Sequence, residues 1–192
     1  MKGAVELLRS RIPAIIALVV AAGLVGIDRL TKWLIVQNIR LGESVPGIKI
    51  GDKRLIDITN IRNEGAAFGI MQGRQTFLIV VSLLLTVGAV AVMFSGKVKS
   101  KTVIASITLI VAGGIGNLID RISQGYVVDF IELQFINFAV FNFADMCVVS
   151  GACLMFLSVV SDEIREYKAR RACEESAAEA DGQSENISEN NE

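Results

Sequence analysis

The stretch that decides the fold is Gln75–Gly96, QTFLIVVSLLLTVGAVAVMFSG, which contains 22 consecutive uncharged residues. A helix needs about 20 mainly apolar residues to cross the hydrocarbon core of a bilayer. Three further stretches are similar: Pro13–Ile27 with apolar residues continuing to Val36, Thr102–Ile119, and Leu133–Ser161, where Asp145 is the only charge. The sequence therefore predicts four membrane-spanning helices, at about residues 13–35, 75–96, 102–120 and 141–161.

The composition agrees with a membrane protein. The 192 residues are 52% hydrophobic, and the mean hydropathy is +0.53. We expect one four-span domain over about residues 1–172. The first span could alternatively be a secretory signal peptide, because basic residues precede it and the residues Ala21-Ala22-Gly23 are small. Three further spans and the lack of a clear cleavage pattern favour an uncleaved helix.

The flanking charges predict the orientation of the spans. Basic clusters lie before the first span, between the second and third, and after the fourth: Lys2, Arg9, Arg11; Lys97, Lys99, Lys101; and Arg165, Lys168, Arg170, Arg171. The positive-inside rule makes that side cytoplasmic, together with both termini. The tail 173–192 contains seven acids and no Lys or Arg, and we expect it to be disordered in the cytoplasm.

The two loops on the other side contain strand-like segments. Leu55–Ile61 alternates apolar and polar residues, as a half-buried strand does. Gly125–Leu133 is rich in β-branched and aromatic residues. It would either pair with the first segment or lie on the membrane surface.

Acidic residues collect at one depth. Asp28 lies 17 residues beyond Arg11, Asp120 lies 19 beyond Lys101, and Asp145 lies 17 before Asp162. The helix rise converts these separations to roughly 26–28 Å, so all three acids reach the outer edge of the membrane. Arg29, Lys32, Asn117, Arg121 and Asn142 belong to the same layer. For the three cations, snorkelling to the headgroups is the alternative.

The residue types restrict the chemistry. The chain has no histidine, which removes Ser-His and Cys-His catalysis and argues against a zinc site. Its three cysteines show no disulfide pattern. Insertion of an acid within a membrane span costs roughly 2.5–3.5 kcal/mol, and such residues are usually functional, so Asp145 is a candidate functional residue. Asp129 is also surrounded by hydrophobic residues, and the two acids form a candidate hydrolytic pair.

Five short motifs occur in order between about residues 28 and 151: DRLTK at 28–32, NEGAAFG at 63–69, GGIGNLIDR at 113–121, VVDF at 127–130 and FNFAD at 141–145. Together they make the chain resemble bacterial lipoprotein signal peptidase, also called signal peptidase II. Two departures concern the shape of a loop. Residues 137–140 lack the proline or tryptophan common in that family, and Met146 replaces a frequent serine.

The resemblance implies four transmembrane helices, mainly α, with a small extracytoplasmic β-cradle drawn mostly from residues 37–74 and a short surface helix. It implies an aspartic endopeptidase that needs no metal or cofactor. Such an enzyme removes the signal peptide of diacylglyceryl-modified prolipoproteins, cutting just before the lipid-bearing cysteine. The family's catalytic aspartates fall on Asp129 and Asp145. Its surrounding substrate-binding or site-orienting positions fall on Asp28, Asn63, Gly65, Asn117, Arg121 and Asn142.

The expected partners are the prolipoprotein and membrane lipid, with no nucleic acid. The expected location is the bacterial cytoplasmic (inner) membrane, with the active site near its outer face. A proton-coupled transporter could also use intramembrane acids, but polar residues would then lie near the middle of the spans. A non-catalytic scaffold is the remaining alternative. No Gly-x-Gly-Asp stretch indicates a presenilin-like protease.

Overall fold

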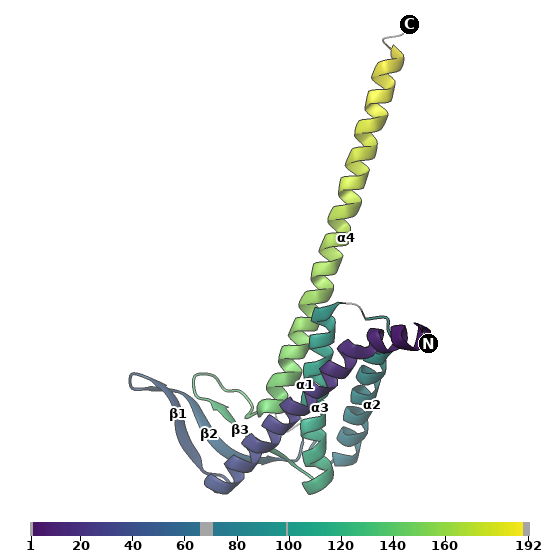
Figure 1. Ribbon diagram of the computed structural model, residues 1–192. Coiled ribbons are helices and arrows are strands. Elements are labelled where there is room, and N and C mark those ends of the chain that lie inside the picture. The colour runs from purple at the N-terminus through teal and green to yellow at the C-terminus, as the bar shows by residue number, and fades with distance from the viewer. Residues whose placement is uncertain (1, 66–70, 99, 190–192) are drawn as a thin grey trace. The chain divides into compact units, whose positions relative to one another are not determined.

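The computed structural model describes residues 2–65, 71–98 and 100–189. The elements follow the order α1 (Lys2–Asn38), β1 (Ser44–Ile50), β2 (Lys53–Asn63), α2 (Gln75–Phe94), α3 (Lys101–Gln124), β3 (Val127–Leu133) and α4 (Phe143–Glu189), as Figure 1 shows. The chain divides into two compact units, Met1–Leu154 and Met155–Glu192.

Four helices have the length and composition to cross a membrane, which confirms the four predicted spans. They cover Arg11–Asn38, Gln75–Phe94, Lys101–Gln124 and Phe143–Ala172. The end of the third helix and the start of the fourth differ from the predicted positions. The third helix continues four residues past Asp120, and the fourth begins at Phe143, two residues later than expected.

Capping residues explain the ends of α3. The Ser100 side chain accepts a hydrogen bond from the backbone N–H of Val103 at the start of the helix. At the other end Gly125 adopts φ +79° and donates its N–H to the carbonyl of Arg121. A residue without Cβ takes this left-handed conformation easily, so the helix ends there and the chain turns into β3.

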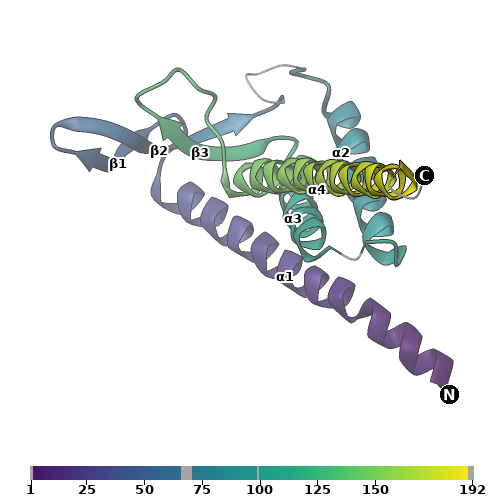
Figure 2. The ribbon, with the colours of Figure 1, turned by 90° about the horizontal axis from the view of Figure 1, so that it is seen from above.

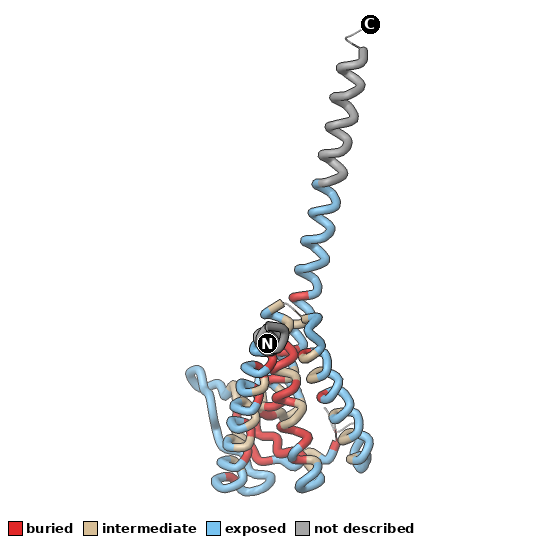
Figure 3. The backbone as a smooth tube through the Cα atoms, turned by 45° about the vertical axis from the view of Figure 1, so that its right-hand side comes forward, coloured by how far each residue is buried: buried red, intermediate tan, exposed pale blue. Residues whose placement is uncertain are grey.

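The central helix of the first unit is α3. Half of its most apolar stretch is buried, compared with 22% for α1 and 11% for α2. It packs against both of those helices, and Figure 3 shows that the buried parts of the chain gather where the helices of this unit lie together. Small residues permit the close approach of helices in a membrane. A Cβ at Gly151 of α4, for example, would lie 2.7 Å from the carbonyl oxygen of Ser106 in α3.

The sheet has three antiparallel strands in the order β1-β2-β3. In Figure 2, β1 lies farthest from the helices and β3 nearest to them. The predicted strand 55–61 lies within β2, and its partner β3 lies within the predicted segment 125–133, with Asp57 opposite Glu132. The fully buried positions of β2 are polar: Asp57, Thr59 and Asn60. Asn60 donates to the carbonyl of Ile39 at 2.7 Å, which fastens the sheet to the end of α1.

A short surface helix was also expected from the resemblance. In the described parts of the chain, every helical segment belongs to α1, α2, α3 or α4, and residues 134–140 form bends and irregular backbone between β3 and α4. Residues 66–69 of the motif NEGAAFG lie outside the described residues.

The second unit consists of the continuation of α4. Ion pairs of helical spacing join Arg165 to Asp162 at 3.9 Å and Arg170 to Glu166 at 3.7 Å. The backbone stays helical to Glu189, where composition predicts a disordered tail. The alanines and glutamates of EESAAEA at 174–180 are strong helix formers, which accounts for this continuation. Disorder of the tail in solution stays a prediction.

Candidate active site

Asp129 lies in the middle of β3, and only 2% of its surface is exposed. Its Oδ2 accepts a hydrogen bond from Asn63 Nδ2 at 2.8 Å, and its Oδ1 accepts one from Asn142 Nδ2 at 2.6 Å. Asn63 is the last residue of β2, and the antiparallel register sets it opposite Val127. The pairing of β2 with β3 therefore positions the first donor on this carboxylate.

Asp145 is the third residue of α4, and it forms a capping box with Asn142. The Asn142 side-chain oxygen accepts from the backbone N–H of Asp145 at 3.0 Å, while Asp145 Oδ2 accepts from the backbone N–H of Asn142 at 3.1 Å. Asp145 Oδ1 accepts from Asn117 Nδ2 of α3 at 2.7 Å. The start of α4 and one residue of α3 thus fix this carboxylate.

The two aspartates line one cavity of about 520 Å³, so the fold brings them together. Asn142 is fully buried and contacts both of them. Each of the four carboxylate oxygens accepts one hydrogen bond from an amide. The remaining wall is largely apolar and includes residues 138–141 and Met146. Two acids held this way are oriented by neutral donors, and one side of the pair remains open to the cavity.

Burial, and secondly the neighbouring Asp145, raise the pKa of Asp129 from 3.8 to about 6. The hydrogen bonds from Asn63 and Asn142 and the charge of Lys32 act in the opposite direction. Two carboxylates that share a desolvated site cannot both ionise easily, so the pair holds one proton over a range of pH that reaches toward neutrality.

An ionic cluster, buried except at Arg29, lies beside the pair. We define it as Asp28, Arg29 and Lys32 of α1 with Asp120 of α3. Lys32 Nζ lies 3.0 Å from Asp28 and 2.8 Å from Asp120, and Arg29 bonds the same two carboxylates. Lys32 is only 2% exposed, so the snorkelling alternative is wrong for this residue. Asp28 and Asp120 meet on one ammonium group, and their depth in the membrane stays a prediction.

The ionic cluster reaches the backbone next to each aspartate. Asp28 Oδ1 accepts from the N–H of Ala144, the residue before Asp145, at 3.1 Å. Asp120 Oδ2 accepts from the N–H of Val128, the residue before Asp129, at 3.4 Å. Asp28 therefore acts on the site through the backbone of α4.

Arg121 and Gly65 form a further set of contacts at the site. Arg121 lines the cavity, and its Nη2 donates to the carbonyl of Gly65 at 3.3 Å. The N–H of Gly65 donates to Asn63 Oδ1 at 2.9 Å. This turn holds the amide of Asn63 with its nitrogen directed at Asp129.

The structure brings together all eight residues that were predicted for the site. The sequence did not predict the ion pairs of Asp120, Arg29 and Lys32. It predicted only that these residues lie at the same depth as the site. A signal was present, because Asp28 and Lys32 have the i, i+4 spacing of a helical ion pair. The phenylalanines 138 and 141 pack edge to face at 5.9 Å in the cavity wall. Phe141 belongs to the motif FNFAD, but Phe138 had no such signal.

Comparison with known proteins gives consistent matches. The family model described as Signal peptidase (SPase) II matches residues 20–161 of this chain. The lipoprotein signal peptidase of Streptococcus pneumoniae is 40% identical over 151 residues, which cover 79% of this chain and 95% of the relative. That of Enterococcus faecalis is 35% identical over 152 residues, with coverage of 78% and 90%.

Two solved bacterial membrane enzymes have a similar structure. One, determined by the in meso method at 2.3 Å resolution, gives a TM-score of 0.68 at 29% identity and covers 77% of this chain and 88% of its own. The other, at 1.9 Å resolution, gives a TM-score of 0.66 at 30% identity, with coverage of 76% and 93%. The family match includes every residue of the candidate site.

Proposed function

This chain belongs to the signal peptidase II family, and from that premise we propose that it removes the signal peptide from diacylglyceryl-modified prolipoproteins, cutting just before the lipid-bearing cysteine. Membership makes the chain a multi-pass bacterial membrane protein and a peptidase. The aspartic type of catalysis, with Asp129 and Asp145 as the pair, is our proposal. The comparisons do not support the alternative of a transporter, because the matched family and relatives are peptidases.

The observation that carries the proposal is the pair of aspartates bridged by Asn142 on one cavity wall. The ionised member of such a pair takes a proton from a water molecule, which then attacks the peptide carbonyl. The protonated member donates a hydrogen bond to the carbonyl oxygen and stabilises the oxyanion as it forms. The proton is then available for the leaving amine. The titration belongs to the pair rather than to either residue.

Other cavity residues are suited to hold the substrate. Arg121 Nε is buried and has no hydrogen-bond partner among the described residues. A buried donor without a partner is costly, and a substrate carbonyl would satisfy it. The apolar wall at 138–141 and Met146 suits a lipid-modified segment better than a polar peptide.

The test is cleavage of a diacylglyceryl prolipoprotein by the purified protein, followed as a gel shift. Asp129→Asn and Asp145→Asn should each reduce turnover by at least a thousandfold, since each removes one half of the acid–base pair. The matched control is Asp57→Asn. Asp57 is a buried aspartate of the same sheet, but it pairs with Arg54 and does not line the cavity.

The control should cleave the substrate at a rate within a few fold of the wild type. Turnover retained by either cavity variant, in protein whose cooperative thermal unfolding shows that it is folded, would sink the assignment of the pair. Loss of turnover in Asp57→Asn alone would place the chemistry elsewhere.

A further inference from the structure

Lys32 is a buried lysine whose three N–H groups all have acceptors. Its Nζ lies 2.8 Å from Asp120 Oδ2, 3.0 Å from Asp28 Oδ2 and 2.9 Å from Asn117 Oδ1. An ammonium group has three donors and no acceptor. The first two contacts balance charge within the ionic cluster. The third contact leaves the cluster and reaches a side chain of the active site.

That third contact fixes which way the amide of Asn117 faces. An asparagine amide can rotate and exchange its oxygen and nitrogen, and the neighbours decide between the two orientations. Lys32 can only donate, and Asn142 Nδ2 donates to the same Asn117 oxygen at 3.1 Å. The Asn117 nitrogen is therefore turned to Asp145, where it donates to Oδ1 at 2.7 Å.

We propose that Lys32 is a positioning residue of the peptidase: it holds Asn117 with its nitrogen directed at Asp145 and supplies a fixed positive charge behind the aspartate pair. This inference rests on the proposed function and adds to it a residue that touches neither aspartate. Without the ammonium group, the Asn117 oxygen loses one of its two donors, and Asp145 loses a fixed partner.

The charges around Asp129 set the expected pH behaviour. From α4 it faces Asp145, from α3 Arg121 with Asp120 behind it, and from α1 Lys32 with its partners Asp28 and Arg29. From β2 it faces Asn63, which is uncharged. Lys32 favours the ionised form of Asp129. Its removal should let the pair keep the shared proton to higher pH.

Arg29 offers a matched control. It is the other cation of the ionic cluster, and it bonds the same two carboxylates, Asp28 and Asp120. Its remaining hydrogen bond goes to the carbonyl of Gly116 at 3.1 Å rather than to a side chain of the active site. Loss of either cation unbalances the cluster equally, but only loss of Lys32 releases Asn117.

The experiment compares Lys32→Met with Arg29→Met in kcat, KM and the pH profile of prolipoprotein cleavage. Lys32→Met should lower kcat between roughly tenfold and a hundredfold with little change in KM, because small displacements of reacting groups are costly. The alkaline limb of its profile should move up by roughly one pH unit, as removal of a nearby opposite charge predicts. Arg29→Met should lower the unfolding temperature but keep the alkaline limb of the wild type.

A second pair of variants separates the loss of positioning from a loss of stability. Lys32→Met and Arg29→Met are each combined with Asp120→Asn, which keeps the cluster neutral. The difference between the two double variants should reproduce the shift of the alkaline limb. A wild-type limb in both Lys32 variants, or the same shift in the Arg29 variants, would overturn the positioning role. Failure of the proposed function is distinct, because the wild type would then not cleave the substrate.

Discussion

Asn142 combines a structural and a functional task in one side chain. Its oxygen caps α4, and its amide nitrogen donates to Asp129. Its backbone N–H donates to Asp145. The usual N-cap interaction thus places the third residue of the helix, Asp145, next to a strand residue that is distant in sequence. This single residue joins local helix chemistry to the geometry of the pair.

Replacement of Asn142 by alanine should therefore affect both properties. Loss of the cap should lower the free energy of unfolding by about 1 kcal/mol. Loss of the donor to Asp129 should lower kcat by roughly a hundredfold, because the carboxylate is no longer held in place. Thermal unfolding and prolipoprotein turnover measure the two effects separately.

Ser100→Ala is the matched control, since Ser100 caps α3 and accepts from the N–H of Val103. It should cost a similar free energy of unfolding and leave kcat near that of the wild type. If Asn142→Ala keeps the wild-type kcat, Asn142 is a cap and no more.

The raised pKa of Asp129 predicts how the free energy of unfolding depends on pH. Its pKa is raised from 3.8 to about 6 in the folded protein, mainly by burial. Between about pH 4 and pH 6 the folded protein holds a proton that the unfolded chain has released. The free energy of unfolding should therefore fall as the pH rises through this window and level off above it.

Asp129→Asn should flatten that slope, because one member of the coupled pair no longer titrates. Relative to the wild type, it should gain up to about 3 kcal/mol at pH 7–8, with the gain vanishing near pH 4. Denaturant or thermal unfolding in detergent across pH 4–8 measures the difference. Asp57→Asn is the control that should keep the slope, and parallel curves for wild type and Asp129→Asn would contradict the prediction.

At the scale of elements, glycines set how closely α4 approaches α3. A Cβ at Gly113 would run into the carbonyl oxygen of Ala144 and lie 2.7 Å from a methyl carbon of Val148. Because Ala144 precedes Asp145, this contact holds both the helix pair and the site. Gly88 in α2 differs, since a Cβ there would have no described neighbour within 4 Å.

Gly113→Ala should therefore destabilise the protein by about 1–3 kcal/mol, the usual cost of overpacking, and should lower turnover as α4 shifts. Gly88→Ala should be neutral or stabilise by up to about 1 kcal/mol, because alanine favours helix. Thermal unfolding of both variants in one detergent tests the difference. Equal effects of the two substitutions would show that α4 can move away from Gly113 without loss of stability.

The sequence predicted the helices and strands better than it predicted which side chains contact one another. Uncharged runs such as Gln75–Gly96 locate the helices because hydropathy alone decides insertion in a bilayer. Asp129 and Asp145 were found from motifs whose order is specific. The spacing of Lys32 from Asp28 indicates a helical ion pair, but it does not indicate that the lysine is buried. That burial comes from the packing of α1 on α3, which depends on contacts between residues 85 or more positions apart.

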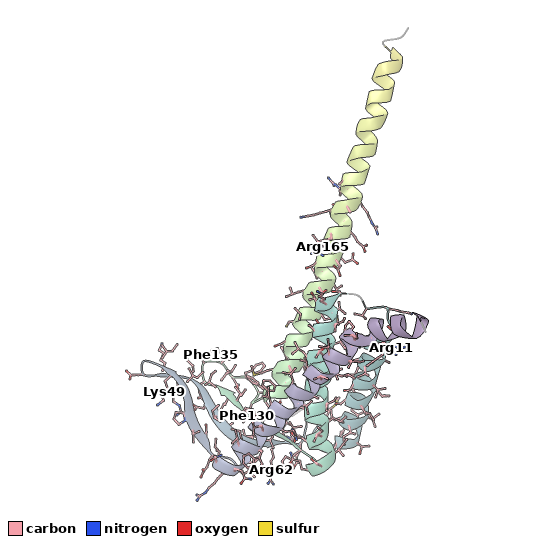
Figure 4. The ribbon with its side chains drawn as sticks, in the orientation of Figure 1. Arg11, Lys49, Arg62, Phe130, Phe135 and Arg165 are labelled. Atoms are coloured by element: carbon pink, nitrogen blue, oxygen red, sulfur yellow. The ribbon has the colours of Figure 1, made fainter. Side chains whose placement is uncertain are left out.

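At the scale of the whole molecule, the positions of the basic residues predict how the first unit is oriented in the membrane. Arg11 lies toward the N-terminal end of α1, and Lys49 lies on the sheet that begins beyond its other end, as Figure 4 shows. The aspartate pair belongs to the sheet end, because Asp129 is a strand residue. The loop between α2 and α3 contains Lys97, and Lys101 is the first residue of α3. The positive-inside rule then predicts that the sheet and the pair face the outside of the cell.

Cysteine labelling tests this orientation. In a variant with its native cysteines replaced, Lys49→Cys should react with a membrane-impermeant maleimide on intact spheroplasts. Lys97→Cys, an equally exposed lysine position on the other side, should react only after permeabilisation. The reason is physical: a diacylglyceryl group keeps the precursor in the bilayer with its cleavage site at the outer interface, so a pair on the cytoplasmic side could not reach the scissile bond. The reverse labelling pattern would contradict both the orientation and the proposed route of the substrate to Asp129 and Asp145.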